Sequence, residues 1–117
     1  MGDKPHKRLI VWQKAMDFVE TIYKLTERFP KEEQFGLVAQ LRRASISVAS
    51  NIAEGAARHT TKEHLQFFYI ARGSISELDT QIEISHRLGF LTVEQRRTTL
   101  EALDEIVYQL RVRNLGG

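Results

Sequence analysis

Between residues 40 and 58 the chain reads QLRRASISVASNIAEGAAR, and this stretch decides the fold. Its apolar residues recur at alternating steps of three and four, which is the period of one face of an α-helix. With one more turn toward the N-terminus, the stripe consists of Val38, Leu41, Ser45, Val48 and Ile52. The segment SISVAS alternates briefly as a strand would, but it lies inside the longer helical period. The pattern therefore predicts a helix over about residues 34–57 with one face in a hydrophobic core.

A line of polar residues runs beside this stripe rather than opposite it. At about 100° per residue, these side chains fall within one narrow arc of the helix. They are Gln40, Arg43, Ser47, Asn51, Glu54 and Arg58. Polar groups at the border of a core need partners, because an unsatisfied buried polar group costs about 1–3 kcal/mol. We expect a half-buried polar seam here, and a solvated helix face is the alternative.

Three further segments carry the same helical period. A helix is predicted over about residues 9–28, and it is ended by Pro30, which lacks a backbone donor. Another is predicted over about residues 61–88, with Thr60 or Thr61 as N-cap and Gly89 after its end. The last is predicted over about residues 92–114 and begins at Thr92. The apolar stripes of the three helices are Ala15, Phe18, Ile22, Leu25 and Phe29; Phe68, Ala71, Ile75, Leu78, Ile82 and Ser85; and Leu100, Leu103, Val107 and Leu110.

Helices of this length joined by short connections pack as antiparallel neighbours. A chain of 117 residues suits one domain with one core, so we assign residues 1–117 to a single unit. Strand signals are nearly absent. The sequence therefore predicts an all-α fold, an antiparallel up-and-down four-helix bundle.

The helix over 61–88 carries a second face that the core does not explain. Gly73, Glu77 and Gln81 lie there, and Ile70 and Ile84 share it. A glycine within a helix costs about 1 kcal/mol relative to alanine, so Gly73 indicates close approach of another backbone. We expect these residues to join the polar seam or an oligomer interface. The alternative is a solvated face on which Gly73 is merely tolerated.

The guanidinium of Arg43 needs a carboxylate partner if the seam is buried. We predict that Arg43 pairs with Glu54 or Glu77, either within the chain or between subunits.

No catalytic centre is evident in the sequence. The chain has no cysteine, which excludes disulfides, thiolate catalysis and cysteine-bound metals. Glycine-rich phosphate loops and common hydrolase and metalloprotease motifs are missing. The pair Glu83 and His86 has half of the di-iron spacing found in some helix bundles, but no second pair completes it. We expect no enzymatic activity, no metal and no cofactor.

The chain is mildly basic, with a formal net charge of +2 and a pI of about 9.1. Binding to nucleic acid depends on where basic residues cluster, and the candidates are Arg42, Arg58, His59 and Lys62. Acidic residues are interleaved with them, so a mixed solvated surface is the alternative. No apolar run could span a membrane, and no signal peptide is evident, so we expect a cytoplasmic protein that does not contact membranes.

Several segments together resemble a known family. They are VWQKA at 11–15, FPKEEQFGL at 29–37, QLRRASISVASNIAEGAAR at 40–58, FFYIARGSISELDTQI at 67–82 and LGFL at 88–91. In these segments the chain resembles the four-helix-bundle proteins encoded in intervening sequences of 23S ribosomal RNA genes, also labelled the S23 ribosomal protein family. One departure is Ala49, where that family commonly has proline. The matched motif residues are Gln40, Arg42, Arg43, Ala44, Asn51, Glu54, Gly55, Arg58, Gly73, Ser74 and Glu77.

The resemblance implies a homopentamer with a central channel and no catalytic residues. It also implies kinship with Avd, the accessory protein of diversity-generating retroelements, which is associated with nucleic acid and a reverse transcriptase. The leading hypothesis is therefore a non-enzymatic homo-oligomer that binds RNA or DNA through basic surface. A protein-interaction scaffold without nucleic acid, and a metal or small-molecule enzyme, are the alternatives.

Overall fold

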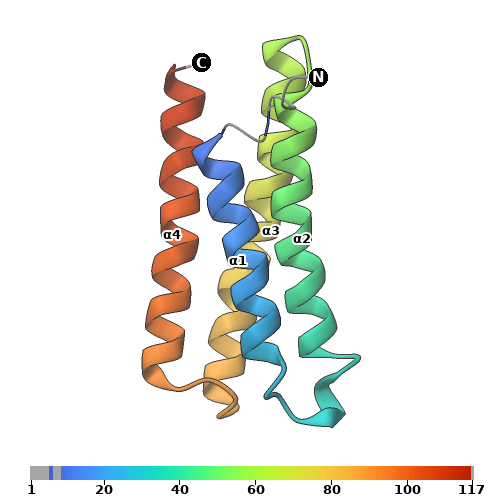
Figure 1. Ribbon diagram of the computed structural model, residues 1–117, viewed down its shortest axis with the longest axis vertical. Coiled ribbons are helices and arrows are strands. Elements are labelled where there is room, and N and C mark those ends of the chain that lie inside the picture. The colour runs from blue at the N-terminus through green and yellow to red at the C-terminus, as the bar shows by residue number, and fades with distance from the viewer. Residues whose placement is uncertain (1–5, 7–8, 117) are drawn as a thin grey trace.

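Four long helices make up almost all of the structure, a computed structural model that describes residue 6 and residues 9–116, with side chains as far as residue 112 (Figure 1). In order they are α1 (Ile10–Thr26), a short 3-10 helix η2 (Lys31–Glu33), α2 (Leu37–Ala56), α3 (Thr61–Arg87) and α4 (Val93–Gly116). The described part of the chain contains no strand. Within it, no helix combines the length and the apolar character that a membrane crossing requires.

The helices alternate in direction and close into a ring. Each packs on the next along the chain, and α4 returns to pack on α1. The α2–α3 turn and the C-terminal end of α4 lie at one end of the bundle, drawn at the top of Figure 1. The α1–α2 and α3–α4 connections lie at the other end. The predicted up-and-down four-helix bundle is confirmed.

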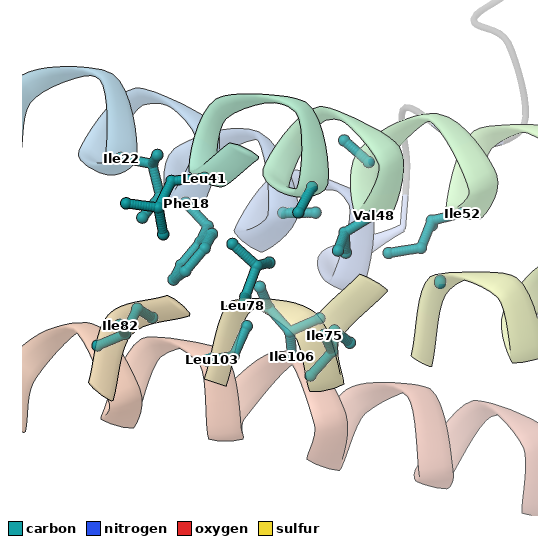
Figure 2. Packing of buried hydrophobic residues seen from close by; sticks show 14 of the residues in the cluster. Phe18, Ile22, Leu41, Val48, Ile52, Ile75, Leu78, Ile82, Leu103 and Ile106 are labelled. Atoms are coloured by element: carbon teal, nitrogen blue, oxygen red, sulfur yellow. The ribbon is translucent and has the colours of Figure 1, made fainter. Parts of the chain in front are cut away.

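The core is formed by apolar residues from all four helices, as Figure 2 shows for its central part. The stripe predicted for α3 is buried along its whole length. The stripe of α4 is shifted from the prediction: Leu103 and Leu110 are buried, whereas Leu100 and Val107 are only half-buried. Ile106 and Thr99 take the buried positions instead. Because α4 packs on α3 and α1 but not across on α2, its buried arc is narrow and its centre depends on those two neighbours.

The connection between α1 and α2 differs from the sequence prediction. The predicted second helix begins at about residue 34, but α2 begins at Leu37, and residues 31–33 form the separate helix η2. Gly36 breaks the helical path with φ −107° and ψ −110°. The Glu33 carboxylate accepts a hydrogen bond from the Leu37 backbone N–H at 3.4 Å. The short helix η2 and a break at Gly36 therefore replace the predicted first turn of the second helix.

The ends of the α3–α4 hairpin are capped by specific side chains and one glycine. Thr60 accepts from the Glu63 backbone N–H at 3.2 Å, which begins α3. Gly89 has φ +85°, the left-handed conformation that ends a helix and that glycine adopts without steric cost. Thr92 and Gln95 form a reciprocal pair at 3.0 and 2.9 Å, a capping box that begins α4.

Candidate functional site

The polar seam joins α2 to α3 within the chain. The hydroxyl groups of Ser47 and Ser74 lie 2.8 Å apart and share a hydrogen bond. The Asn51 amide donates to the Ser47 carbonyl oxygen at 2.8 Å and to its hydroxyl at 3.1 Å. At this level of the bundle the seam is a satisfied polar contact between two helices.

About two turns nearer the other end, the seam is less well satisfied. The Gln81 amide nitrogen donates to the Gln40 side-chain oxygen at 3.5 Å, which is the long limit of a hydrogen bond. The Gln81 side-chain oxygen is buried and has no hydrogen-bond partner within the described residues. The seam therefore contributes more at Ser47 than at Gln40.

Arg43 and Glu54 lie on the same face of α2 but do not pair within the chain. They are eleven residues apart, which is about 16 Å along a helix. Glu54 instead pairs with Arg58 one turn away, at 2.9 Å. Arg43 and Glu77 are both exposed, and neither forms an ion pair in the part of the chain that the structure describes. Pairing of Arg43 across subunits stays a prediction.

The close helix–helix approach occurs at Gly55 and not at Gly73. A Cβ atom on Gly55 would lie 3.1 Å from the Cβ of Phe67 and 3.1 Å from the ring of Phe68, so α2 and α3 meet closely there. A Cβ atom on Gly73 would meet nothing within 4 Å. Gly55 lies near the end of a helix, where a glycine is readily interpreted as a terminator, so its packing role was missed.

Three of the four predicted nucleic-acid contacts lie together at the α2–α3 turn. Arg58, His59 and Lys62 are all exposed there. The Arg58 guanidinium stacks over the Phe67 ring, 4.7 Å from its centre. The backbone carbonyl oxygen of Arg58 contacts His64 Nε2. Glu54 neutralises part of the Arg58 charge, but His59 and Lys62 face solvent.

Arg42 lies elsewhere and has a different environment. It is sixteen residues from Arg58, which is about 24 Å along the helix. Its Nε donates to the Thr26 hydroxyl at 3.0 Å, and its guanidinium lies 4.3 Å from the centre of the Tyr23 ring. Arg42 therefore ties α2 to α1 and does not extend the basic turn.

Glu83 and His86, the pair with half of a di-iron spacing, have other partners. Arg96 donates to the Glu83 carboxylate at 2.7 Å and Arg87 at 3.2 Å, and these hydrogen bonds lower the pKa of Glu83 below its ordinary value. His86 Nδ1 lies 3.0 Å from the Leu91 carbonyl oxygen. The described residues contain no group of three side chains able to hold a metal ion. Glu83 therefore connects α3 to α4.

Comparison with known proteins identifies the family. The family model described as 23S rRNA-intervening sequence protein matches residues 7–111. The chain belongs to this family. The family matches the resemblance found in the sequence, and the match spans α1, α2, α3 and most of α4.

A solved structure supports the fold of this member of the 23S rRNA-intervening sequence protein family. It is a crystal structure of a protein with unknown function from the S23 ribosomal protein family of Bacteroides thetaiotaomicron. The two chains are 23% identical and superpose with a TM-score of 0.83, over 90% of this chain and 95% of the other. No curated protein matches the sequence. At this identity the likeness shows a shared fold.

Proposed function

We propose that this protein is a non-enzymatic, cytoplasmic homo-oligomer that binds RNA or DNA through basic surface. The observation that carries the nucleic-acid part is the α2–α3 turn, where Arg58, His59 and Lys62 are exposed at one end of the bundle. Phosphate groups are bound by such clusters with little dependence on sequence, because the attraction is electrostatic. Arg42 is left out of this surface because it lies several turns from Arg58 and its Nε donates to Thr26 of α1.

A binding titration with a matched charge control tests this part. Labelled structured RNA and duplex DNA are titrated at low salt with the wild-type protein, Lys62→Glu and Lys31→Glu, and fluorescence anisotropy is measured. Both lysines are exposed, and they lie at opposite ends of the bundle. The two variants have the same net charge, because each replaces one lysine with glutamate. We expect Lys62→Glu to weaken binding by about tenfold and Lys31→Glu to change it far less.

Salt gives a second readout of the same titration. Each phosphate contact lowers the logarithm of the affinity by about 0.9 per tenfold increase in salt for duplex DNA. The wild-type slope should therefore be steeper than that of Lys62→Glu. Absence of binding at low salt, or equal weakening by the two variants, would overturn the proposal.

The oligomeric part is supported by the outer face of α3, defined here as Ile70, Gly73, Glu77 and Ile84. All four are exposed, and Ile70 and Ile84 are 46% and 41% exposed although apolar. Exposed apolar side chains beside an open glycine form a surface that a second helix can approach closely. A second copy of the chain on this face would cover them.

The number of copies follows from the family resemblance, and one partner protein follows from the kinship with Avd that this resemblance implies; both are proposals. We infer a pentamer, and a reverse transcriptase is the kind of partner protein that this kinship would imply.

The second candidate function is a protein-interaction scaffold with no nucleic-acid ligand. Exposed aromatic residues outside the four that define the outer face of α3 favour it, since Tyr69 and Tyr108 are both 59% exposed. Recovery of a protein partner in a pull-down that nuclease does not affect, together with no nucleic-acid binding, would favour this function over the first.

A further inference from the structure

A groove on the surface of α1 and α2 is separate from both the basic turn and the outer face of α3. Its volume is about 460 Å³. It is lined by Tyr23 of α1, by Gln34 and Phe35 of the connection, and by Val38, Ala39, Arg42, Arg43 and Ile46 of α2. The connection that supplies Phe35 lies at the end of the bundle opposite the α2–α3 turn (Figure 1).

The apolar side chains of this groove are unusually exposed. Phe35 is 90% exposed, and Ile46 and Tyr23 are 43% and 37% exposed. Phe35 follows η2 and precedes Gly36, and its side chain lines the groove outside the core. Burial of an aromatic side chain that is so exposed is favourable, and it requires a second surface that covers the ring.

The charged groups of the groove are of one sign. Arg42 and Arg43 line it, and among the described side chains no carboxylate does. The guanidinium of Arg42 is held in place by the Thr26 hydroxyl and the Tyr23 ring. The guanidinium of Arg43 is exposed and forms no hydrogen bond or ion pair with the residues that the structure describes. The groove therefore offers one fixed and one free cation next to an apolar floor.

We propose that this groove binds a short amphipathic segment of a partner protein that presents apolar side chains with a carboxylate beside them. The apolar side chains would cover Phe35 and Ile46, and the carboxylate would pair with Arg43. The aliphatic floor of Val38, Ala39 and Ile46 favours a hydrocarbon side chain over a stacked base. Arginine with an aromatic neighbour is also the composition that recurs at the centre of protein interfaces.

The test begins with a random peptide library selected on the wild-type protein, with removal of peptides that also bind the double variant Phe35→Ala, Arg43→Glu. Enriched peptides should combine Asp or Glu with Leu, Ile, Phe or Met. One enriched peptide is then labelled, and its affinity is measured for each single variant by fluorescence anisotropy.

Each variant has a matched control at the other end of the bundle. Tyr69→Ala removes an exposed aromatic ring as Phe35→Ala does, and Lys62→Glu reverses one charge as Arg43→Glu does. We expect Phe35→Ala and Arg43→Glu each to weaken peptide binding by about tenfold or more, and both controls to leave it within about twofold.

Several results would overturn the proposal. They are no enrichment, enrichment of peptides without carboxylates, equal weakening by the controls, and displacement of the peptide by single-stranded RNA. If Phe35→Ala without peptide had a lower mass in solution than the wild-type protein, the groove would be assigned to a second copy of the chain instead. Thermal unfolding followed by circular dichroism checks that the variants fold. If Phe35→Ala does not fold, the peptide affinity of Arg43→Glu tests the proposal.

Discussion

At the scale of single residues, two glycines on neighbouring helices have opposite roles. Gly55 is buried where α2 meets α3, and the side chains of Phe67 and Phe68 fill the space that its own side chain would need. Gly73 is exposed, with open space where a Cβ would lie. Glycine is therefore required for packing at position 55. At position 73, within a single chain, it makes the helix less stable than alanine would.

Substitution of these glycines should change stability in opposite directions. Gly55→Leu should lower the free energy of unfolding by about 1–3 kcal/mol, because the inserted side chain meets two phenylalanines. In the dissociated chain, Gly73→Ala should raise it by about 0.5–1 kcal/mol, because alanine favours the helix and meets no neighbour within the chain. Urea unfolding of both variants, at a dilution where the chain is monomeric, measures the difference. A neutral Gly55→Leu would show that the two helices can separate at no cost.

Arg42 and Arg43 are adjacent in sequence, and the structure distinguishes them. We expect Arg42→Ala to lower the free energy of unfolding by about 1–2 kcal/mol, because it removes the hydrogen bond to Thr26 and the contact with Tyr23. Arg43→Ala is the matched control and should stay within about 0.5 kcal/mol of wild type. Neither should weaken RNA binding by more than a small factor. Loss of RNA binding in Arg42→Ala at unchanged stability would restore Arg42 to the nucleic-acid surface.

The sequence could not separate these two arginines. A turn of about 100° between neighbours places one on the side of α1 and the other in solvent, and only the position of α1 decides which is which. Arg42 was grouped with Arg58 by composition, although their spacing in the sequence already placed them several turns apart.

At the scale of elements, an ion pair between Glu83 and Arg96 links α3 to α4. Glu83 of α3 accepts from Arg96 of α4 and from Arg87 one turn along its own helix. Beside it, Gly89 and the Thr92–Gln95 capping box set the path of the connection. The ion pair and the caps therefore both favour the antiparallel packing of α4 on α3.

Acid should weaken this hairpin. The hydrogen bonds from Arg96 and Arg87 lower the pKa of Glu83 in the folded state below its ordinary value of 4.5. Its contribution to stability is therefore present above pH 4.5 and is lost as the pH falls through the lowered pKa. Glu83→Gln should be less stable than wild type near neutral pH, and the difference should shrink in acid. Urea unfolding across this range measures it, and a difference independent of pH would contradict the account.

The period of each helix could be predicted from the sequence more reliably than its rotation. Every predicted position of the α3 stripe is buried, because four of the six carry large apolar residues at the helical period, but the buried Ser74 and Gln81 were not in that stripe. In α4 the choice between Val107 and Ile106 depends on which neighbours the helix meets, and apolar residues at both positions fit the period. Helix η2 was missed because three residues after a proline have no period to detect.

At the scale of the whole molecule, the four stripes close one core and leave the outer face of α3 uncovered. Ile70, Gly73 and Ile84 add nothing to that core, yet they lie on one face beside the polar seam. The family and the bundle could be recognised from the sequence, because the motifs of α2 and α3 are specific and the periodicity is clear. Contacts between copies could not be predicted in the same way, because the periodicity of one chain does not show what covers its outer faces.

The most direct test of the oligomeric proposal is the mass of the purified protein in solution, measured by light scattering on a gel-filtration column. We expect a mass several times the 13.5 kDa of the chain, and five times that value for the pentamer. Gly73→Leu should lower this mass while the helical content stays unchanged, because leucine fills the open space on the outer face of α3 without meeting the core. A mass of 13.5 kDa for the wild-type protein at all concentrations would contradict the account.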